Sequence, residues 1–307
     1  MTRRTLLAIL LFALIPFGCS SPQHLIVCGM EEVFIIDAAR AERGDLTKIW
    51  SWRAKDRPEL PAELHAAFRT TDDCKPVAGG TRILISSSSG ACALVEHPSG
   101  KVLWYARVPN AHSIELLPND RIVAAASTHA KGNRLMLFDI TRPDAPLFET
   151  PLPSAHGVVW DNARQHLWAL GYDQLQCYDL GDWQSDHPSL KLRASHPLPD
   201  AGGHDLLAVP ESDDLVLSVH KHVYLFDRKT LTFRPHPELG DLVNVKCVSP
   251  HPTTGRVAHL RGEGKEWWST RIHLLAPQGE IQLPDERMYK ARWMEAPSRQ
   301  GGAMSTR

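Results

Sequence analysis

"VPNAHSIELLPND" (residues 108–120) places His112 at the head of an apolar run that ends in a Pro-Asn-Asp turn. Short apolar runs between turn signals are typical of β-strands. The same arrangement recurs in "PSAHGVVWDN" (153–162) and "DAGGHDLLAVP" (200–210), each with a histidine before the apolar run. A strand headed by a histidine is therefore a repeated feature of this chain.

The series extends in both directions, with lysine in place of histidine. The heads of the six units are Lys75, His112, His156, His204, Lys246 and Lys290. Successive heads are separated by 37, 44, 48, 42 and 44 residues. Units of about 40–50 residues with four short strands each are typical of β-propellers. The sequence therefore predicts an all-β protein, a six-bladed β-propeller.

The two ends of the chain complement each other. Only one strand, "KARWM" (290–294), follows the last head, whereas three strands are predicted near the N-terminus at 24–29, 32–37 and 47–52. Together they make one blade, with the C-terminal strand innermost. Such pairing leaves no free edge between the first and last blades.

The predicted propeller is a single domain covering residues 24–295, and the tail at 296–307 is predicted to be disordered. Within the domain, "PAELHAAF" (61–68) begins with proline and continues with helix formers, so we expect a short helix over the upper face. Aspartate follows the third strand in four units, where it is expected to cap the next turn: Asp37, Asp139, Asp179 and Asp227.

The first residues resemble an export signal rather than part of the domain. Arg3 and Arg4 precede an apolar run that is short for a membrane span, and Gly18-Cys19 follows it. We predict a lipoprotein-type signal peptide at residues 1–18 with Cys19 lipidated, ordinary cleavage nearby being the alternative. The predicted location is extracytoplasmic, either secreted, periplasmic or on the bacterial envelope, with membrane contact only through the lipid anchor.

Composition excludes several classes of protein. Charged residues are 22% and hydrophobic residues 43% of the 307, too polar a balance for a protein with many membrane spans. The net charge of −1 argues against nucleic-acid binding by bulk charge. The cysteines beyond Cys19 are odd in number and form no C-x-x-C, so we expect small buried side chains rather than a zinc knuckle: Cys28, Cys74, Cys92, Cys177 and Cys247.

In a propeller the heads of the innermost strands meet around the central channel, so the six heads are expected to form one ring. Three ammonium groups around one axis repel each other unless an anion or solvent compensates. We therefore predict a site for an anionic, carbohydrate-derived ligand at the upper mouth of the channel. The predicted ligand-binding residues are Lys75, Lys246, Lys290, Arg292, Asp73, Asp205, Trp267 and Trp268.

Three further interpretations stay open. His112, His156 and His204 are suited to holding a divalent metal such as zinc, although nearby lysines weaken cation binding. The same histidines are candidate catalytic residues of a polysaccharide lyase or a metal-assisted hydrolase acting on an acidic sugar. In a third interpretation the ring is structural and the propeller is a scaffold for protein interactions. The sequence does not decide whether the protein is an enzyme, and it does not indicate an oligomeric state.

The chain also resembles an uncharacterised family of bacterial secreted six-bladed propeller proteins. The segments that carry the resemblance are "DDCKPVAGG" (72–80), "NAHSIELLPN" (110–119), "AHGVVWD" (155–161), "GGHDL" (202–206), "WWST" (267–270) and "YKARW" (289–293). This resemblance implies the fold and no activity. A looser, architectural similarity is to propeller polysaccharide lyases of the oligogalacturonate type, which place histidines around the axis but are larger.

Overall fold

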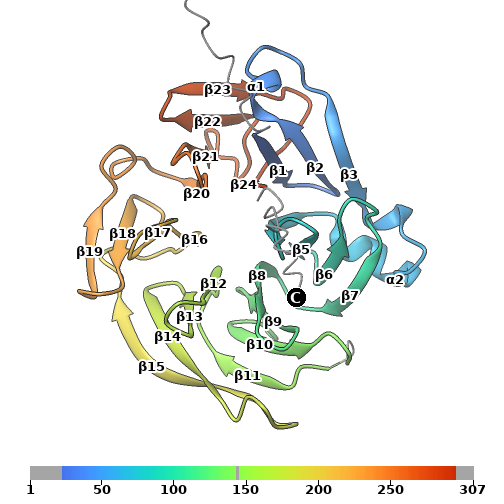
Figure 1. Cartoon of the computed structure of the whole chain (residues 1–307), viewed down its shortest axis with the longest axis vertical. Helices are drawn as coiled ribbons and strands as arrows, with labels where there is room; N and C mark the ends of the chain where they lie inside the picture. Colours follow the sequence, from blue (N-terminus) through green and yellow to red (C-terminus); the bar gives the residue numbers. More distant parts are fainter. Residues whose placement is uncertain (1–22, 143–144, 295–307) are drawn as a thin grey trace, which may run out of the picture.

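The structure, a computed structural model, describes residues 23–142 and 145–294, which form six four-stranded antiparallel sheets around a central axis (Figure 1). The predicted all-β, six-bladed propeller is confirmed. The predicted signal peptide at 1–18, the lipidation site Cys19 and the predicted tail at 296–307 lie outside the described residues.

We number the blades 1 to 6 and give their strands from the axis outward. Blade 1 contains β24 (Lys290–Trp293), β1 (His24–Cys28), β2 (Glu32–Asp37) and β3 (Lys48–Arg53). Blade 2 contains β4 (Thr71–Val77), β5 (Arg82–Ser87), β6 (Ala91–Glu96) and β7 (Val102–Arg107). Blade 3 contains β8 (Ala111–Leu117), β9 (Arg121–Ala126), β10 (Arg134–Asp139) and β11 (Phe148–Pro151).

The second half of the ring repeats this order. Blade 4 contains β12 (Gly157–Asp161), β13 (His166–Leu170), β14 (Gln174–Gly181) and β15 (Ser189–Pro197). Blade 5 contains β16 (Asp205–Ala208), β17 (Asp214–Ser218), β18 (Val223–Asp227) and β19 (Thr232–Pro235). Blade 6 contains β20 (Val245–Pro250), β21 (Val257–Arg261), β22 (Arg271–Leu275) and β23 (Gly279–Gln282).

Blade 1 joins the two ends of the chain as the sequence predicts. β24 pairs antiparallel with β1, with Leu25 opposite Trp293 and Cys28 opposite Lys290. Figure 1 shows the red strand β24 inside the blue strands β1–β3. The ring is therefore closed by backbone hydrogen bonds between segments more than 250 residues apart.

The core is divided among the blade interfaces. Six apolar clusters are present, and each combines buried side chains of two neighbouring blades. Middle strands such as β9 are buried throughout because both of their faces are covered, whereas the outermost strand β7 alternates buried and exposed residues. The five cysteines of the described region are buried and free, as expected.

The connection between β3 and β4 differs from the prediction. It contains α2 (Ala62–His65) between two 3₁₀ turns, Ala54–Asp56 and Ala66–Phe68. Its side chains Leu64 and Phe68 are buried in the cluster of blades 1 and 2, with Phe68 against Trp52 at 5.4 Å between ring centroids. Figure 1 shows α2 at the outer edge of the ring rather than over the channel, because its apolar face packs against the blade interface.

Aspartate caps the turn after the third strand in three of the four predicted places. Asp37 accepts a hydrogen bond from the backbone N–H of Arg40 at the start of α1 (Ala38–Ala41). Asp139 and Asp227 accept from backbone N–H groups two residues later, at 2.8 and 2.7 Å. Asp179 instead faces the side chains of Arg193 and His166 across the sheet. The prediction is wrong for Asp179.

The channel edge of the innermost strands is stabilised between blades. That edge presents N–H groups without a partner in their own sheet, and buried ones need an acceptor. The acceptor comes from the preceding blade: Ser113 Oγ for Val158 N (3.4 Å), Asp205 Oδ2 for Val248 N (3.1 Å), Cys247 Sγ for Ala291 N (3.4 Å) and Ser249 Oγ for Trp293 N (3.3 Å). Side chains at the axis thus hold adjacent blades in register.

None of the helices in the described part of the chain has the length and apolar composition to span a membrane.

Acidification from pH 6.5 to pH 5 should destabilise the propeller through buried neutral histidines. His259 on β21 is 5% exposed and stacks on His273 of β22 at 5.1 Å. Burial, followed by the charges of His273, His236 and Arg261, lowers the pKa of His259 to about 3. The unfolded chain binds this proton below about pH 6.5 and the folded chain does not, so stability is lost as the pH falls through this window. The expected loss from His259 alone is about 2 kcal/mol.

Urea unfolding at pH 7 and pH 5 measures this loss. The variant His259→Leu should lose about 2 kcal/mol less than the parent between the two values, whereas His187→Gln, at an exposed position, should behave like the parent. Burial also lowers the pKa of His156 and His204, so part of the dependence should persist in the variant. An identical pH dependence in His259→Leu and the parent would contradict the expectation.

Candidate functional site

The mouth of the channel is formed by one residue from the head of each innermost strand. We call this set the mouth ring: Asp72, His112, His156, His204, Lys246 and Tyr289. Asp72, His112 and Lys246 each occupy a β-bulge, where the strand register shifts by one residue. A bulge turns its extra side chain out of the ladder, which here brings it to the mouth.

The predicted ring differs from this one at two of its six positions. Lys75 lies three residues beyond Asp72 on β4, and Lys290 lies one residue beyond Tyr289. Neither lines the upper cavity. Asp72 and Tyr289 occupy these two positions instead. The prediction aligned the strands on basic residues, whereas the bulge on β4 and the start of β24 place a different residue of each strand at the mouth.

A cavity of about 330 Å³ opens at the mouth ring. Besides the mouth ring, its walls include Ser88, Asn110 and Trp267. Trp267 is 39% exposed and lies 5.6 Å from the ring of Tyr289. Trp268, the other predicted stacking residue, is not part of the wall; its ring lies under the guanidinium of Arg287 at 5.1 Å. Only one of the two tryptophans is therefore available to a ligand in this cavity.

The three predicted histidines lie next to one another. Ring centroids are 4.3 Å apart for His112 and His156 and 5.7 Å apart for His156 and His204. In His112 and His156, Nδ1 lies 3.1 and 2.8 Å from the backbone carbonyl two residues earlier. This places the proton on Nδ1 and leaves Nε2 as a hydrogen-bond acceptor. Burial, then the charges of His112 and His204, holds the pKa of His156 well below its usual range.

His112 forms a pair with Asp72. Its Nε2 lies 3.6 Å from Asp72 Oδ1, and the other carboxylate oxygen accepts the backbone N–H of Ser88 at 2.5 Å. Nδ1 of His112 already donates its proton to a carbonyl. Nε2 can therefore approach the carboxyl group of Asp72 favourably only if either Nε2 or that carboxyl group carries a further proton. Burial raises the pKa of Asp72, which favours retention of that proton.

Lys246 is the only ammonium or guanidinium group on the wall of the upper cavity within residues 23–142 and 145–294. It is 7% exposed, and its Nζ lies 3.2 Å from Nε2 of His204. In the described part of the chain no carboxylate lies within ion-pair distance of it. Burial, then repulsion from Lys290, lowers its pKa to about 8. Burial and the charge of Lys246 lower the pKa of His204, so the neighbour of this ammonium group at neutral pH is a neutral imidazole rather than a carboxylate.

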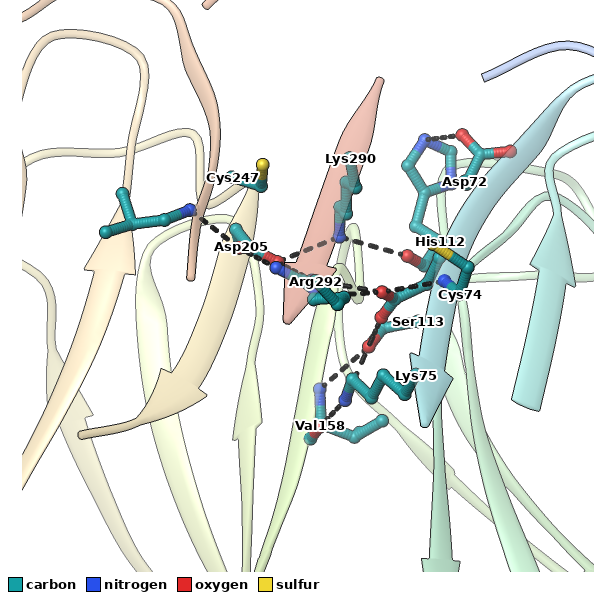
Figure 2. A network of polar contacts seen from close by, with 12 residues as sticks. Asp72, Cys74, Lys75, His112, Ser113, Val158, Asp205, Cys247, Lys290 and Arg292 are labelled. Carbon is teal, nitrogen blue, oxygen red and sulfur yellow. Dashed lines mark hydrogen bonds and ion pairs between the residues drawn. The ribbon is translucent and has the colours of Figure 1, made fainter. Parts of the chain in front are cut away.

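Below the mouth ring lies a buried layer of paired charges, drawn in Figure 2. Arg292 on β24 donates to Asp205 at 2.8 and 2.6 Å and to Asp73 at 3.1 Å. Lys290 lies 3.0 Å from Asp205 and donates to the carbonyl of His112 at 3.3 Å. Ser113 donates to Asp73 at 2.8 Å. Arg292, Lys290, Asp73 and Asp205 were predicted to bind ligand; in the structure they contact one another.

The pKa directions agree with this pairing. Burial alone would raise the pKa of Asp205 and lower that of Lys290, yet the opposite charges outweigh burial in both cases. The pKa of Asp205 is lowered and that of Lys290 raised. Both groups are therefore ionised at neutral pH and compensate each other without a ligand.

Lys75 closes the layer from below. Its Nζ lies 3.3 Å from Glu115 and 3.8 Å from Asp73, and it donates to the carbonyl of Val158. Figure 2 shows Lys75 and Val158 at one end of the network and His112 with Asp72 at the other. Lys75 and Glu115 form the floor of a second cavity of about 780 Å³ at the opposite mouth, whose walls are mostly apolar. The larger cavity offers charges that are already paired, so the upper cavity is the better candidate for specific recognition.

No cluster of three or more His, Cys, Asp or Glu side chains is arranged to hold a metal ion in the region that the structure describes. Two of the three imidazoles would offer Nε2 to a cation. The third, His204, has the ammonium of Lys246 at its Nε2, which disfavours a cation there. The divalent metal predicted at His112, His156 and His204 stays a prediction.

Two mouth-ring residues were missed in the sequence. The signal that could have found them is the pattern head–any–apolar, which recurs as Asp72-Asp73-Cys74, His112-Ser113-Ile114, His156-Gly157-Val158, His204-Asp205-Leu206, Lys246-Cys247-Val248 and Tyr289-Lys290-Ala291. Alignment on this pattern, instead of on basic residues, selects the observed ring.

One similar solved structure shares the fold of this chain. A protein of unknown function from Bacteroides caccae is 12% identical with a TM-score of 0.62, covering 89% of this chain and 99% of that one. Kuenenia stuttgartiensis hydrazine synthase is 14% identical with a TM-score of 0.48, covering 66% of this chain and 62% of that one. A search of curated proteins found no match.

The sequence profile of a family of unknown function, DUF6528, matches residues 30–298, nearly the whole propeller, including all six members of the mouth ring. The chain, a β-propeller, therefore belongs to the DUF6528 family, a family of unknown function.

Proposed function

We propose that this propeller binds an acidic sugar in the cavity at its mouth ring. The observation that carries the proposal is Lys246, a nearly buried ammonium group without a carboxylate partner among the described residues. A buried charge is costly until an opposite charge pairs with it. A carboxylate of a ligand would supply that partner through a charge-assisted hydrogen bond.

The rest of the wall favours a polyhydroxylated ligand over a simple anion. His156 has Nδ1 engaged by a backbone carbonyl and keeps Nε2 as an acceptor, so it calls for a donor such as a sugar hydroxyl group. Ser88 and Asn110 add further polar groups, and the exposed ring of Trp267 offers a flat apolar surface. At ~30 Å³ per water-sized group, the cavity has room for about ten such groups, roughly one sugar ring.

The predicted signal peptide and lipidated Cys19 would place this site outside the cytoplasm, where bacteria meet polysaccharides. This part of the proposal rests on the sequence alone.

A second candidate, a lyase acting on an acidic sugar, is favoured by the pKa of Lys246 near 8 and by the carboxyl group of Asp72, whose pKa is raised by burial and which lies 3.6 Å from His112. In β-elimination a neutral Lys246 would take the proton next to the sugar carboxylate, and the pair would protonate the departing oxygen as the C–O bond breaks and a C=C bond forms. The same amine cannot pair with the carboxylate as a cation while it acts as a base. Since Lys246 is the single cation on the described wall, binding is the primary proposal.

Calorimetric titration with galacturonate, mannuronate and hyaluronan oligomers tests the proposal, with maltotriose as the uncharged comparison. We expect at least one acidic series to bind and maltotriose not to bind. A rise in ultraviolet absorbance from an unsaturated product during incubation would identify the lyase. If no acidic series binds, or if maltotriose binds equally well, the proposal is wrong and the scaffold interpretation is favoured.

The affinity should fall as the pH rises through about 8. Lys246 must be protonated to pair with a carboxylate, and its pKa in the free protein is about 8. Above that value each pH unit removes about nine-tenths of the remaining ammonium form, so the affinity should drop roughly tenfold per unit. Titrations at pH 7, 8 and 9 measure this. A constant affinity over this range would show that Lys246 does not pair with the ligand.

A further inference from the structure

The rings around the cavity continue beyond it over blades 4 and 5. His220, in the loop between β17 and β18, lies 4.9 Å from His204 between ring centroids. Tyr172, between β13 and β14, lies 6.4 Å from His220. Both side chains are exposed, Tyr172 to 47%, and neither is part of the cavity wall. A polar and aromatic surface therefore leads outward from the mouth ring.

This surface is held in place by the glycines of "GGHDL" (202–206). Gly202 has φ +90°, and a Cβ there would lie 2.3 Å from Nδ1 of His220. A Cβ on Gly203 would lie 2.5 Å from the carbonyl oxygen of Gly171. The backbone N–H of Gly202 donates to the carbonyl of Tyr172 at 2.6 Å. The segment at 202–203 can thus approach the loops that carry Tyr172 and His220 only because Gly202 and Gly203 have no side chains.

The positive charge of Lys246 in the cavity also affects His220. Burial and the charge of Lys246 both lower the pKa of His220, so its ring is neutral at pH 7. A neutral imidazole can accept or donate a hydrogen bond to a hydroxyl group without competing with Lys246 for the carboxylate.

We propose that Tyr172 and His220 form a second subsite, on which the next sugar residue lies when an acidic sugar occupies the cavity. The inference rests on the proposed function and narrows it: the ligand is an acidic oligosaccharide of two or more residues rather than a free sugar acid. The cavity has room for about one sugar ring, and the exposed face of Tyr172 offers the stacking surface for the next.

The test compares monomer and trimer of galacturonate and of mannuronate by calorimetry, with the parent protein, Tyr172→Ala and Tyr172→Phe. The trimer of the series that binds should have about tenfold higher affinity than its monomer. Tyr172→Ala should remove that gain and leave monomer binding unchanged, whereas Tyr172→Phe should keep the gain because the ring remains. Leu192→Ala, at another exposed apolar position on β15, is the matched control and should change neither affinity.

Equal affinities for monomer and trimer in the parent, or a trimer gain that survives Tyr172→Ala, would overturn the second subsite while monomer binding upholds the first. If neither form of either sugar binds, the second subsite and the proposed function fall together for these ligands.

Discussion

Replacing Arg292 by methionine should lower the free energy of unfolding by about 3–5 kcal/mol, the usual cost of removing one partner of a buried ion pair. Arg292 is 2% exposed and donates to Asp205 and Asp73, which come from two other blades. Its loss leaves the buried carboxylate of Asp205 with Lys290 at 3.0 Å and that of Asp73 with the more distant Lys75 at 3.8 Å. Urea unfolding followed by tryptophan fluorescence measures the change.

Arg193→Met is the matched control, since its side chain is 55% exposed and pairs with Asp179 at 3.4 Å. An exposed pair contributes about 0–1 kcal/mol, so this variant should differ little from the parent. The double variant Arg292→Met, Asp73→Asn should recover part of the loss, because Lys290 stays paired with Asp205 and the carboxylate that depended on Arg292 is neutralised. A loss below about 1 kcal/mol in Arg292→Met would contradict the view that this layer holds the blades together.

Replacing Lys246 by methionine should weaken ligand binding without lowering stability, in contrast to the loss of stability expected for Arg292→Met. Affinity for the acidic oligosaccharide should fall about 10- to 100-fold, because a charge-assisted hydrogen bond of about 1.5–3 kcal/mol is lost. Stability should be unchanged or higher, since Lys246 is buried without a carboxylate partner in the described part of the chain and methionine removes that cost. Calorimetry and urea unfolding of the same preparation measure both effects.

Lys101→Met is the control for the loss of one positive charge. Lys101 is exposed in the turn between β6 and β7, the two outer strands of blade 2, and is not part of the wall of the upper cavity. It should change neither affinity nor stability. A drop in affinity equal to that of Lys246→Met would mean that bulk charge, rather than the cavity, attracts the ligand.

Much of the fold could be predicted because the information is local. Apolar runs between turn signals recur at nearly constant spacing, and the single strand at 290–294 complements the three strands near the N-terminus. The helix at 61–68 is predicted over the upper face, because its sequence shows a helix without showing which surface its apolar face meets. In the structure Leu64 and Phe68 meet a blade interface.

The site was predicted only in part because the residues that decide it belong to different blades. Whether a lysine is free or paired depends on distances across the axis: Lys75 meets Glu115, and Lys290 meets Asp205. Both partners lie more than 30 residues away in the sequence. They compensate the charges of Lys75 and Lys290, and of the expected repulsion the effect of Lys290 on Lys246 remains. Bulges add a second difficulty, because one extra residue changes which side chain reaches the mouth.

Among the three lysines of the predicted ring, Lys246 is the one whose ammonium group has no carboxylate partner in the described part of the chain. Its charge therefore requires an external partner. The most direct test is a parallel calorimetric titration of the acidic oligosaccharides into the parent protein and Lys246→Met at pH 7. The account predicts binding to the parent and a 10- to 100-fold weaker affinity in a variant that unfolds at the same or a higher urea concentration. Binding that is equally strong in Lys246→Met, or no binding to the parent, would contradict it.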